Sequence, residues 1–342
     1  MLVSLTLAHN VGEKIRGALA SVVPYVDQCL VFDTGITDDT LTVARSVARD
    51  KLVVVSFPWV DDFSKARNYA LHEAARRGAT RAVMIDSDQR IDWNGHPPDS
   101  VPEVDAPPCW RMRYRGNSFA KEQIFTLPTS RYYSGTTHEA FPAGDCPEWP
   151  HSRVWESDKS PEECAIKFER DVRLLSAATQ RDPKDARAWY YLGQSLQLLK
   201  RWADAQDAFA ACVRETAWDE EAGWSSYQSA CCALERGNLR HGLELCAAGL
   251  QHHAAMAELP WLAGVISFRL GQFQQSVRWA EIAASMPRCG RIGFSLPFAR
   301  WEGPYNVMHH AYLALSNADR AAWAEAETEK MRTARLTAND GS

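Results

Sequence analysis

The stretch RAVMIDSDQRID, residues 81–92, decides how the N-terminal half of the chain is interpreted. The apolar residues from Ala82 to Ile85 have the character of a short buried strand, and two carboxylates, Asp86 and Asp88, follow at once. Such a pair can hold a hard divalent cation such as Mg²⁺ or Mn²⁺, or it can be a polar turn that ends the strand. The surrounding sequence has to decide between these two interpretations.

Upstream of this stretch, short apolar segments alternate with segments of helical spacing. Strands are predicted at residues 2–8, 28–33 and 51–57, and helices at residues 13–26, 38–50 and 62–78. This alternation is typical of β-α-β units, and it predicts a parallel sheet buried on both faces. Ligands of such sheets bind beyond the carboxyl ends of the strands. Polar residues follow the predicted strand ends: Asn10, Asp33, Asp61, Asp62, Asp86 and Asp88.

The middle of the chain changes character. Residues 92–108 hold five prolines and are predicted to form a loop. Residues 109–115 alternate apolar side chains with arginines, which predicts a strand with one basic face. Further antiparallel strands are predicted in QIFTLP and in RYYSGTTHEAFP, with a turn near Gly135.

From about Glu162 the chain is helical and repeats itself. Three segments of similar pattern span residues 188–213, 222–250 and 258–287. Gly237 and Gly271 lie in matching turns 34 residues apart (271 − 237), which is the tetratricopeptide period. A last helical segment, residues 305–335, would cap the stack. This half is expected to be an interaction scaffold, and it could also form a homodimer.

Composition and charge restrict the class of protein and the kinds of partner that can be expected. The 342 residues are 46% hydrophobic and 24% charged, as expected for a globular protein of two domains. A net charge of −5 argues against a nucleic-acid partner. The chain shows no apolar run long enough for a membrane span, no signal-peptide pattern and no Cys-x-x-Cys pair, so a cytoplasmic protein is expected. The predicted domains are 1–160 (α/β), 161–183 (connecting helix), 184–335 (repeats) and 336–342 (flexible tail).

Five blocks of the sequence together resemble a known family. The blocks are LTLAHNVGE, LVFDTGITDDT, WVDDFSKARN, VMIDSDQ and GTTHE, and they cover roughly residues 2–142. They resemble family 2 glycosyltransferases of the GT-A fold, in particular the bacterial branch with a C-terminal tetratricopeptide domain, whose layout the glycocin S-glycosyltransferases share. The resemblance implies a Rossmann-like GT-A domain with a mainly parallel sheet, followed by an all-α domain of helical repeats.

The resemblance also implies a role for each matched residue. The residues that would bind the nucleotide-sugar donor are Ala8, Asn10, Asp33, Ser64, Arg67, Asn68 and Asp86. Asp86 and Asp88 would hold Mn²⁺ or Mg²⁺, and His138 would complete the metal shell. Glu139 would be the general base. Gln89 departs from the pattern, because the family usually has a carboxylate at this position.

The activity implied by the resemblance is metal-dependent, inverting transfer of a sugar. The donor would be a nucleotide sugar, with a UDP-sugar as the first choice, and the acceptor a hydroxyl or thiol of a peptide, protein or carrier. Arg111, Arg113 and Arg115 could face the diphosphate or an acidic acceptor, or they could form a solvated strand face. Gln89 and the short proline-rich segment motivate an alternative, which is a non-catalytic scaffold with a degenerate, nucleotide-sugar-binding transferase domain and a protein-binding repeat domain.

Overall fold

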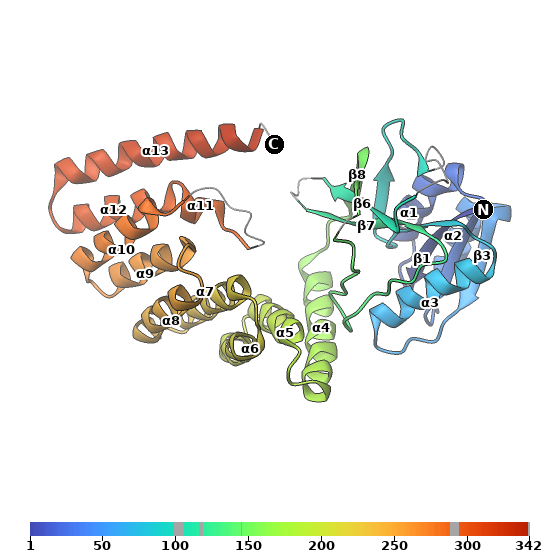
Figure 1. The fold of residues 1–342 in the computed structure, drawn as a ribbon, viewed down its shortest axis with the longest axis horizontal. Helices are drawn as coiled ribbons and strands as arrows, with labels where there is room; N and C mark the ends of the chain where they lie inside the picture. Colours follow the sequence, from blue (N-terminus) through green and yellow to red (C-terminus); the bar gives the residue numbers. More distant parts are fainter. Residues whose placement is uncertain (99–105, 116–118, 145, 288–293, 341–342) are drawn as a thin grey trace. The chain divides into compact units, whose positions relative to one another are not determined.

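The chain divides into two compact units, Met1–Cys164 and Ala165–Ser342 (Figure 1). The computed structural model describes residues 1–98, 106–115, 119–144, 146–287 and 294–340. The first unit combines a sheet with helices, and the described part of the second unit is built from helices and their connections. Each unit has hydrophobic clusters of its own.

The first unit alternates strands and helices over its first 84 residues. Its strands are β1 (Leu2–Ala8), β2 (Gln28–Asp33), β3 (Leu52–Ser56), β4 (Arg81–Met84), β5 (Gln89–Asp92), β6 (Cys109–Tyr114), β7 (Ala120–Thr126) and β8 (Glu148–Glu156). Its helices are α1 (Lys14–Val22), α2 (Thr40–Ala48) and α3 (Phe63–Arg76), with short 3₁₀ turns η1 (Val23–Tyr25) and η2 (Arg49–Lys51). The predicted strands and helices before β5 are confirmed, and so are the strands predicted at β6 and β7.

The strand order in the sheet is β3-β2-β1-β4-β7-β6-β8-β5. Strands β1 to β4 pair in parallel, but β7 is antiparallel to β4 and β6, and β5 is antiparallel to β8. Strands β6 and β8 are also parallel, so four of the seven strand pairs are parallel: the parallel sheet predicted for the first half is present, and the other half is mixed. Strands β5 and β8 were not predicted, and part of the predicted loop at residues 92–108 lies outside the described residues.

The segment RYYSGTTHEAFP does not form the strands that its pattern predicts. It contributes one isolated bridge, between Ser134 and Ala140. Gly135 has φ of 98° and His138 has φ of 50°, and such left-handed backbone conformations break the extended geometry of a strand. The result is a loop, in which neighbouring side chains are not forced to opposite faces.

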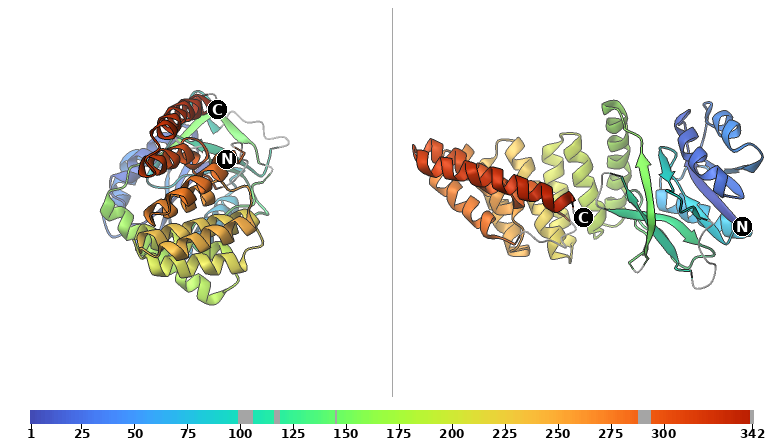
Figure 2. Two further views of the ribbon diagram at one scale, coloured as in Figure 1. Left: turned by 90° about the vertical axis from the view of Figure 1, so that its left-hand side faces the viewer. Right: turned by 90° about the horizontal axis from the view of Figure 1, so that it is seen from above.

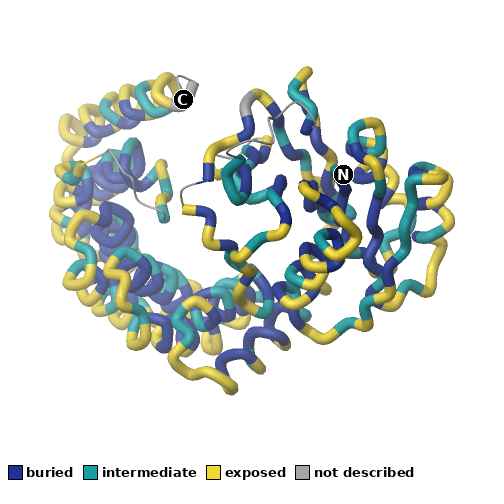
Figure 3. The backbone as a smooth tube through the Cα atoms, turned by 45° about the vertical axis from the view of Figure 1, so that its right-hand side comes forward, coloured by how far each residue is buried: buried dark blue, intermediate teal, exposed yellow. Residues whose placement is uncertain are grey.

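The alternating pattern of each parallel strand places helices on both faces of the sheet. In β2, Cys29 and Val31 belong to the cluster that contains α1 and α2, whereas Leu30 and Phe32 belong to the cluster that contains α3. Figure 3 shows the resulting burial in dark blue within the sheet and the helices. The sheet is buried on both faces here because successive residues of a strand point to opposite sides.

The parallel strands also align their carboxyl ends at one edge. Ala8 pairs in register with Asp33, which in turn pairs with Ser56. At this edge α3 begins, where the Asp62 side chain accepts a hydrogen bond of 3.0 Å from the Lys65 backbone N–H. This cap fixes the start of α3 and the direction of its first turns.

The second unit consists of helices stacked in chain order (Figure 2). They are α5 (Ala186–Leu198), α6 (Trp202–Glu215), α7 (Asp219–Glu235), α8 (Leu239–His252), α9 (Glu258–Arg269), α10 (Phe273–Ser285), α11 (Pro297–Arg300), α12 (Gly303–Ala314) and α13 (Ala318–Asp340). Helix α4 (Pro161–Arg181) precedes them, and the division between the units falls within it. The helical repeats predicted from the sequence are present, but the predicted tail at residues 336–342 is helical as far as Asp340.

Each helix pair turns over a residue with left-handed backbone. These residues are Lys200, Gly237, Gly271 and Ser316, with φ between 57° and 74°. They are spaced by 37, 34 and 45 residues (237 − 200, 271 − 237 and 316 − 271), so the last interval is eleven residues longer than the tetratricopeptide period (45 − 34). Among the described residues, no helix is both long and apolar enough to cross a membrane.

Candidate functional site

The polar residues after β1 and β2 hold their own loops in place. Asp33 accepts hydrogen bonds from the backbone N–H groups of Gly35 (2.8 Å) and Ile36 (2.7 Å). Asn10 accepts one from the Thr37 N–H at 2.8 Å, and its amide donates to the Thr37 hydroxyl at 2.9 Å. The carbonyl of Ala8 accepts from the backbone N–H of Thr34 at 3.0 Å. Three of the predicted nucleotide-binding residues therefore lie together, and the hydrogen bonds described above are made within this pair of loops.

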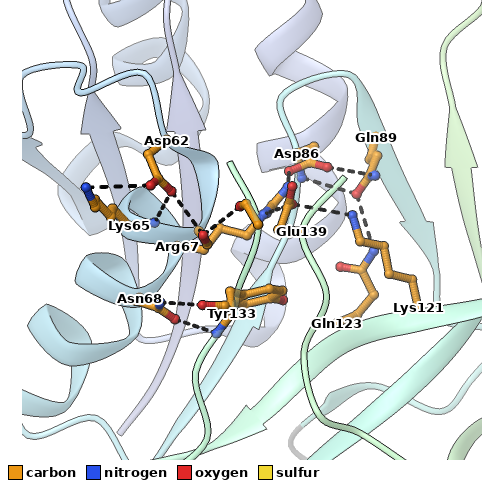
Figure 4. A network of polar contacts seen from close by, with 12 residues as sticks. Asp62, Lys65, Arg67, Asn68, Asp86, Gln89, Lys121, Gln123, Tyr133 and Glu139 are labelled. Carbon is orange, nitrogen blue, oxygen red and sulfur yellow. Dashed lines mark hydrogen bonds and ion pairs between the residues drawn. The ribbon is translucent and has the colours of Figure 1, made fainter. Parts of the chain in front are cut away.

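The guanidinium of Arg67, on α3, lies at the centre of a network of polar contacts near the carboxyl ends of the parallel strands (Figure 4). Its Nη2 lies 2.8 Å from Asp86 Oδ1, and its Nε donates to Glu139 Oε1 at 2.5 Å. The side chains of Arg67 and Glu139 are each 7% exposed. Lys121 Nζ approaches Glu139 to 3.8 Å. The Arg67 cluster, defined as these four residues, joins α3, the segment after β4, β7 and the loop before residue 140.

Charge decides the protonation states in this cluster. Burial acts to raise the pKa of Asp86 and of Glu139, but the positive charges of Arg67 and Lys121 outweigh it and hold both values below the ordinary range. Burial acts to lower the pKa of Arg67, and the two carboxylates raise it above its usual value. Glu139 is thus an ion-paired carboxylate of low basicity, and its role as the general base stays a prediction.

Gln89 connects the cluster to the antiparallel half of the sheet. Its amide nitrogen donates to Asp86 Oδ2 at 3.1 Å and to the Tyr114 hydroxyl at 2.9 Å. Its amide oxygen accepts from the Asp86 backbone N–H at 3.2 Å. A carboxylate at this buried position would repel Asp86 and could not donate, so the amide is the group that fits.

The metal site predicted from the Asp-x-Asp pair is not assembled. Asp86 faces Arg67, whereas Asp88 Oδ2 lies 2.8 Å from Lys159 Nζ. Within the described residues, no group of three or more His, Cys, Asp or Glu side chains is placed to hold a metal ion. The predicted shell of Asp86, Asp88 and His138 is therefore not present, because cations of the chain already neutralise both aspartates.

The remaining predicted residues attach α3 to the loop that follows β7. Ser64 donates to the carbonyl of Gly135 at 2.7 Å. The Asn68 side chain accepts from the Tyr133 backbone N–H at 2.8 Å and donates to its carbonyl at 2.9 Å. These contacts position Glu139 beside Arg67, so Ser64 and Asn68 have an evident structural role.

Sequence reasoning did not identify Lys121, Lys159 or Tyr133 as parts of this region. Burial raises the pKa of Tyr133, and its hydroxyl makes no hydrogen bond to a described residue. Lys159 is held protonated by Asp88 and Glu156, which raise its pKa although burial acts to lower it. Antiparallel strand pairing brings these residues close to the carboxyl ends of the parallel strands. The local sequence does not reveal that pairing, so it gave no signal for them.

The predicted basic strand face is divided among separate partners. The guanidinium of Arg111 donates to the Cys146 carbonyl, Arg113 pairs with Glu148 and Arg115 lies over the Trp155 ring, 3.5 Å from its centroid. The three arginines therefore contact three different neighbours. They do not form one anion-binding surface.

The second unit presents a different candidate site. Helices α5, α7 and α9, the first helices of their pairs, carry large aromatic side chains toward the connection between α10 and α12. We call this surface the aromatic face and define it by Tyr190, Trp218, Trp224 and Trp261. Trp218 is 49% exposed and precedes α7 directly. Two acidic residues, Glu220 and Glu258, accept backbone hydrogen bonds at the same surface.

No protein-family model and no curated protein sequence matches the chain. Similar solved structures include MamA, at 12% identity, with 53% of this chain and 99% of that chain covered and a TM-score of 0.42. YrrB, described as a TPR protein with an unusual peptide-binding site, has 13% identity, 51% and 84% coverage and a TM-score of 0.39. The Cut9–Hcn1 hetero-tetramer of the APC/C has 18% identity, 50% and 31% coverage and a TM-score of 0.39.

These findings overturn the family assignment made from the five sequence blocks. No family model and no curated protein matches the chain, so the assignment has no support beyond the five blocks themselves. The GT-A fold class, the inverting transferase activity and the Asp-x-Asp metal site are therefore wrong. Binding of Mn²⁺, Mg²⁺ or a UDP-sugar is not tested by these observations and stays a prediction that rested on the resemblance.

Proposed function

We propose that this protein is a non-catalytic binding protein, and that its helical-repeat unit holds a peptide segment of a protein partner. The proposal follows the scaffold alternative of the sequence analysis. The observation that carries it is the aromatic face, where the half-exposed ring of Trp218 and the partly buried ring of Trp224 lie beside the buried Tyr190 and the carboxylates of Glu220 and Glu258. Aromatic side chains combine a large contact area with little loss of conformational entropy, and so they dominate peptide-binding surfaces.

The first unit supports this proposal through what its polar residues already do. Arg67 and Lys121 balance the charges of Asp86 and Glu139, and Asp33 and Asn10 form hydrogen bonds within their own loops. Groups that are satisfied within the chain stabilise the unit, and the carboxylates of Asp86 and Glu139, whose pKa values are lowered, are weak bases. Homodimer formation through the repeats stays a prediction.

Selection from a random peptide library displayed on phage tests the proposal with the full-length protein. We expect the wild-type chain to enrich peptides that lose binding when Trp218→Ala is introduced into the aromatic face. Leu313→Ala on α12 is the matched control, because Leu313 is equally exposed at 52% and lies outside the face. Enriched peptides that bind the Trp218→Ala protein as well as the wild type would show that the face is not the binding surface.

A further inference from the structure

The connection between α10 and α12 departs from the repeat. The preceding pairs are joined by short connections, at residues 216–218 and 253–257, whereas this one spans residues 286–302. It contains the eleven residues by which the last repeat interval exceeds 34. Long connections in a compact unit are usually functional, because a short turn would be enough to join the helices. We call its described part, residues 294–300, the insert.

The first three residues of the insert lie against the aromatic face, and the backbone of Leu296 is extended, with φ of −113° and ψ of 97°. Phe294 and Leu296 are half-buried, while Ser295 between them is exposed. The backbone N–H of Phe294 donates to Glu220 at 3.2 Å, and that of Leu296 donates to Glu258 at 2.9 Å. In an extended chain, residues i and i+2 direct their side chains to the same face, which matches this alternation.

The Phe294 ring makes the main side-chain contacts. It stacks on Trp224 with 5.7 Å between ring centroids and 12° between the ring planes. The rings of Tyr190 and Trp218 each lie 5.3 Å from it. Phe294 thus fills the space between α5 and α7 with the kind of group that the aromatic face is built to bind.

The other end of the insert is held by a stronger contact. The guanidinium of Arg300 donates to both carboxylate oxygens of Glu258, at 2.9 and 3.2 Å, and the two side chains are 4% and 0% exposed. Phe298 contacts the Trp261 ring edge-on at 5.8 Å. Removal of one partner from a buried ion pair is strongly unfavourable. The insert is therefore anchored at Arg300, whereas its half-buried start has no ionic anchor of its own.

We infer that residues 294–296 are an internal ligand of the aromatic face, and that a partner replaces them with an extended segment of the same chemistry. That segment carries an aromatic residue and, two positions later, an aliphatic residue. Its backbone N–H groups donate to Glu220 and Glu258, as those of the insert do. This inference rests on the proposed function, because it specifies the ligand and the regulation of the same face.

A labelled peptide, Gly-Gly-Phe-Ser-Leu-Gly-Gly, tests the inference by fluorescence anisotropy with the full-length chain. The wild-type face is occupied, so only the fraction of molecules with a displaced insert can bind, and the apparent Kd is weakened by that fraction. We expect the Phe294→Ala/Leu296→Ala double variant to bind about tenfold more tightly or better. Adding Trp224→Ala should remove the gain, and Leu313→Ala should not. A double variant with wild-type affinity would overturn the inference.

Hydrogen–deuterium exchange on the wild type gives a second readout that needs no variant. At saturating peptide, the backbone amides of Phe294 and Leu296 should exchange faster, because they lose their carboxylate acceptors, while amides within α9 should not. Unchanged exchange with bound peptide would overturn the inference. Library peptides that depend on Trp218 would then still support the proposed function, so the two failures are distinguishable.

Discussion

The two units each bury one arginine against carboxylates, and the two arrangements differ in their balance of charge. Arg67 lies between Asp86 and Glu139, which come from separate segments of the first unit, and Lys121 supplies further positive charge. Arg300 pairs one-to-one with Glu258 in the second unit. In the first case one cation holds three chain segments together. In the second, one pair fixes the end of a single insert.

Buried charge does not by itself mark a binding site. The Arg67 cluster is the more polar region, but its groups are paired with one another. The aromatic face has few charges, but it holds a segment through half-buried rings and two backbone hydrogen bonds. A surface that another molecule can enter needs contacts that can be exchanged for equivalent ones, and of these two regions the aromatic face is the one for which we propose such an exchange.

The largest loss of stability is expected when Arg67 is replaced, and a smaller one when Arg300 is replaced. Arg67→Met leaves two carboxylates with weaker compensation and should reduce the stability of the first unit by about 3–5 kcal/mol, the range for removing one member of a buried ion pair. Arg300→Met leaves the carboxylate of Glu258 without its ion-pair partner, and the loss of stability should be smaller and confined to the second unit. Hydrogen–deuterium exchange resolves the units, so faster exchange should be seen in α3 for the first variant and in α9 for the second. Equal effects on both units would contradict the comparison.

A smaller effect is expected from pH, and its sign follows from the lowered pKa values of Asp86 and Glu139. Carboxylates whose folded pKa lies below the unfolded value of about 4 stabilise the fold above that pH, and the contribution is lost as pH falls through the folded values. The free energy of unfolding of the first unit should therefore decrease on acidification below about pH 4. In Arg67→Met the decrease should be less steep, because burial then opposes ionisation with less compensation. Urea titrations at several pH values measure both slopes.

Most helices and strands of both units could be predicted from the sequence, but the pairing of distant segments could not. Periodicity located β1 to β4 and the helix pairs, because one-face burial imposes a period of two on strands and about 3.6 on helices. It did not locate β8, and therefore did not reveal that Lys159 would neutralise Asp88. The Asp-x-Asp pattern fitted a metal site only while its partners were unknown. Ion pairs between distant segments depend on tertiary pairing, which periodicity does not encode.

The same limit applies to the aromatic face. Trp224 and Trp261 were part of the helical repeat pattern, where aromatic residues usually fill the core between helices. The spacing of 45 residues between Gly271 and Ser316 was visible in the sequence, but serine does not mark a left-handed turn as glycine does. The helical pattern therefore leaves the residues between 287 and 305 without an assignment.

The smallest effect is expected at an exposed ion pair, which sharpens the contrast with both buried arginines. Arg113 Nη2 lies 3.0 Å from Glu148 Oε2, and the side chains are 35% and 41% exposed. Water screens such a pair and ordering two long side chains offsets its attraction, so Arg113→Met should change the free energy of unfolding by less than about 1 kcal/mol. Urea titration beside Arg67→Met provides the comparison. A loss as large as that of Arg67→Met would contradict the expected effect of exposure. The single variant Glu148→Gln then separates the ion pair from packing of the Arg113 stem, because it should show the same loss if the pair is responsible and almost none if the stem is.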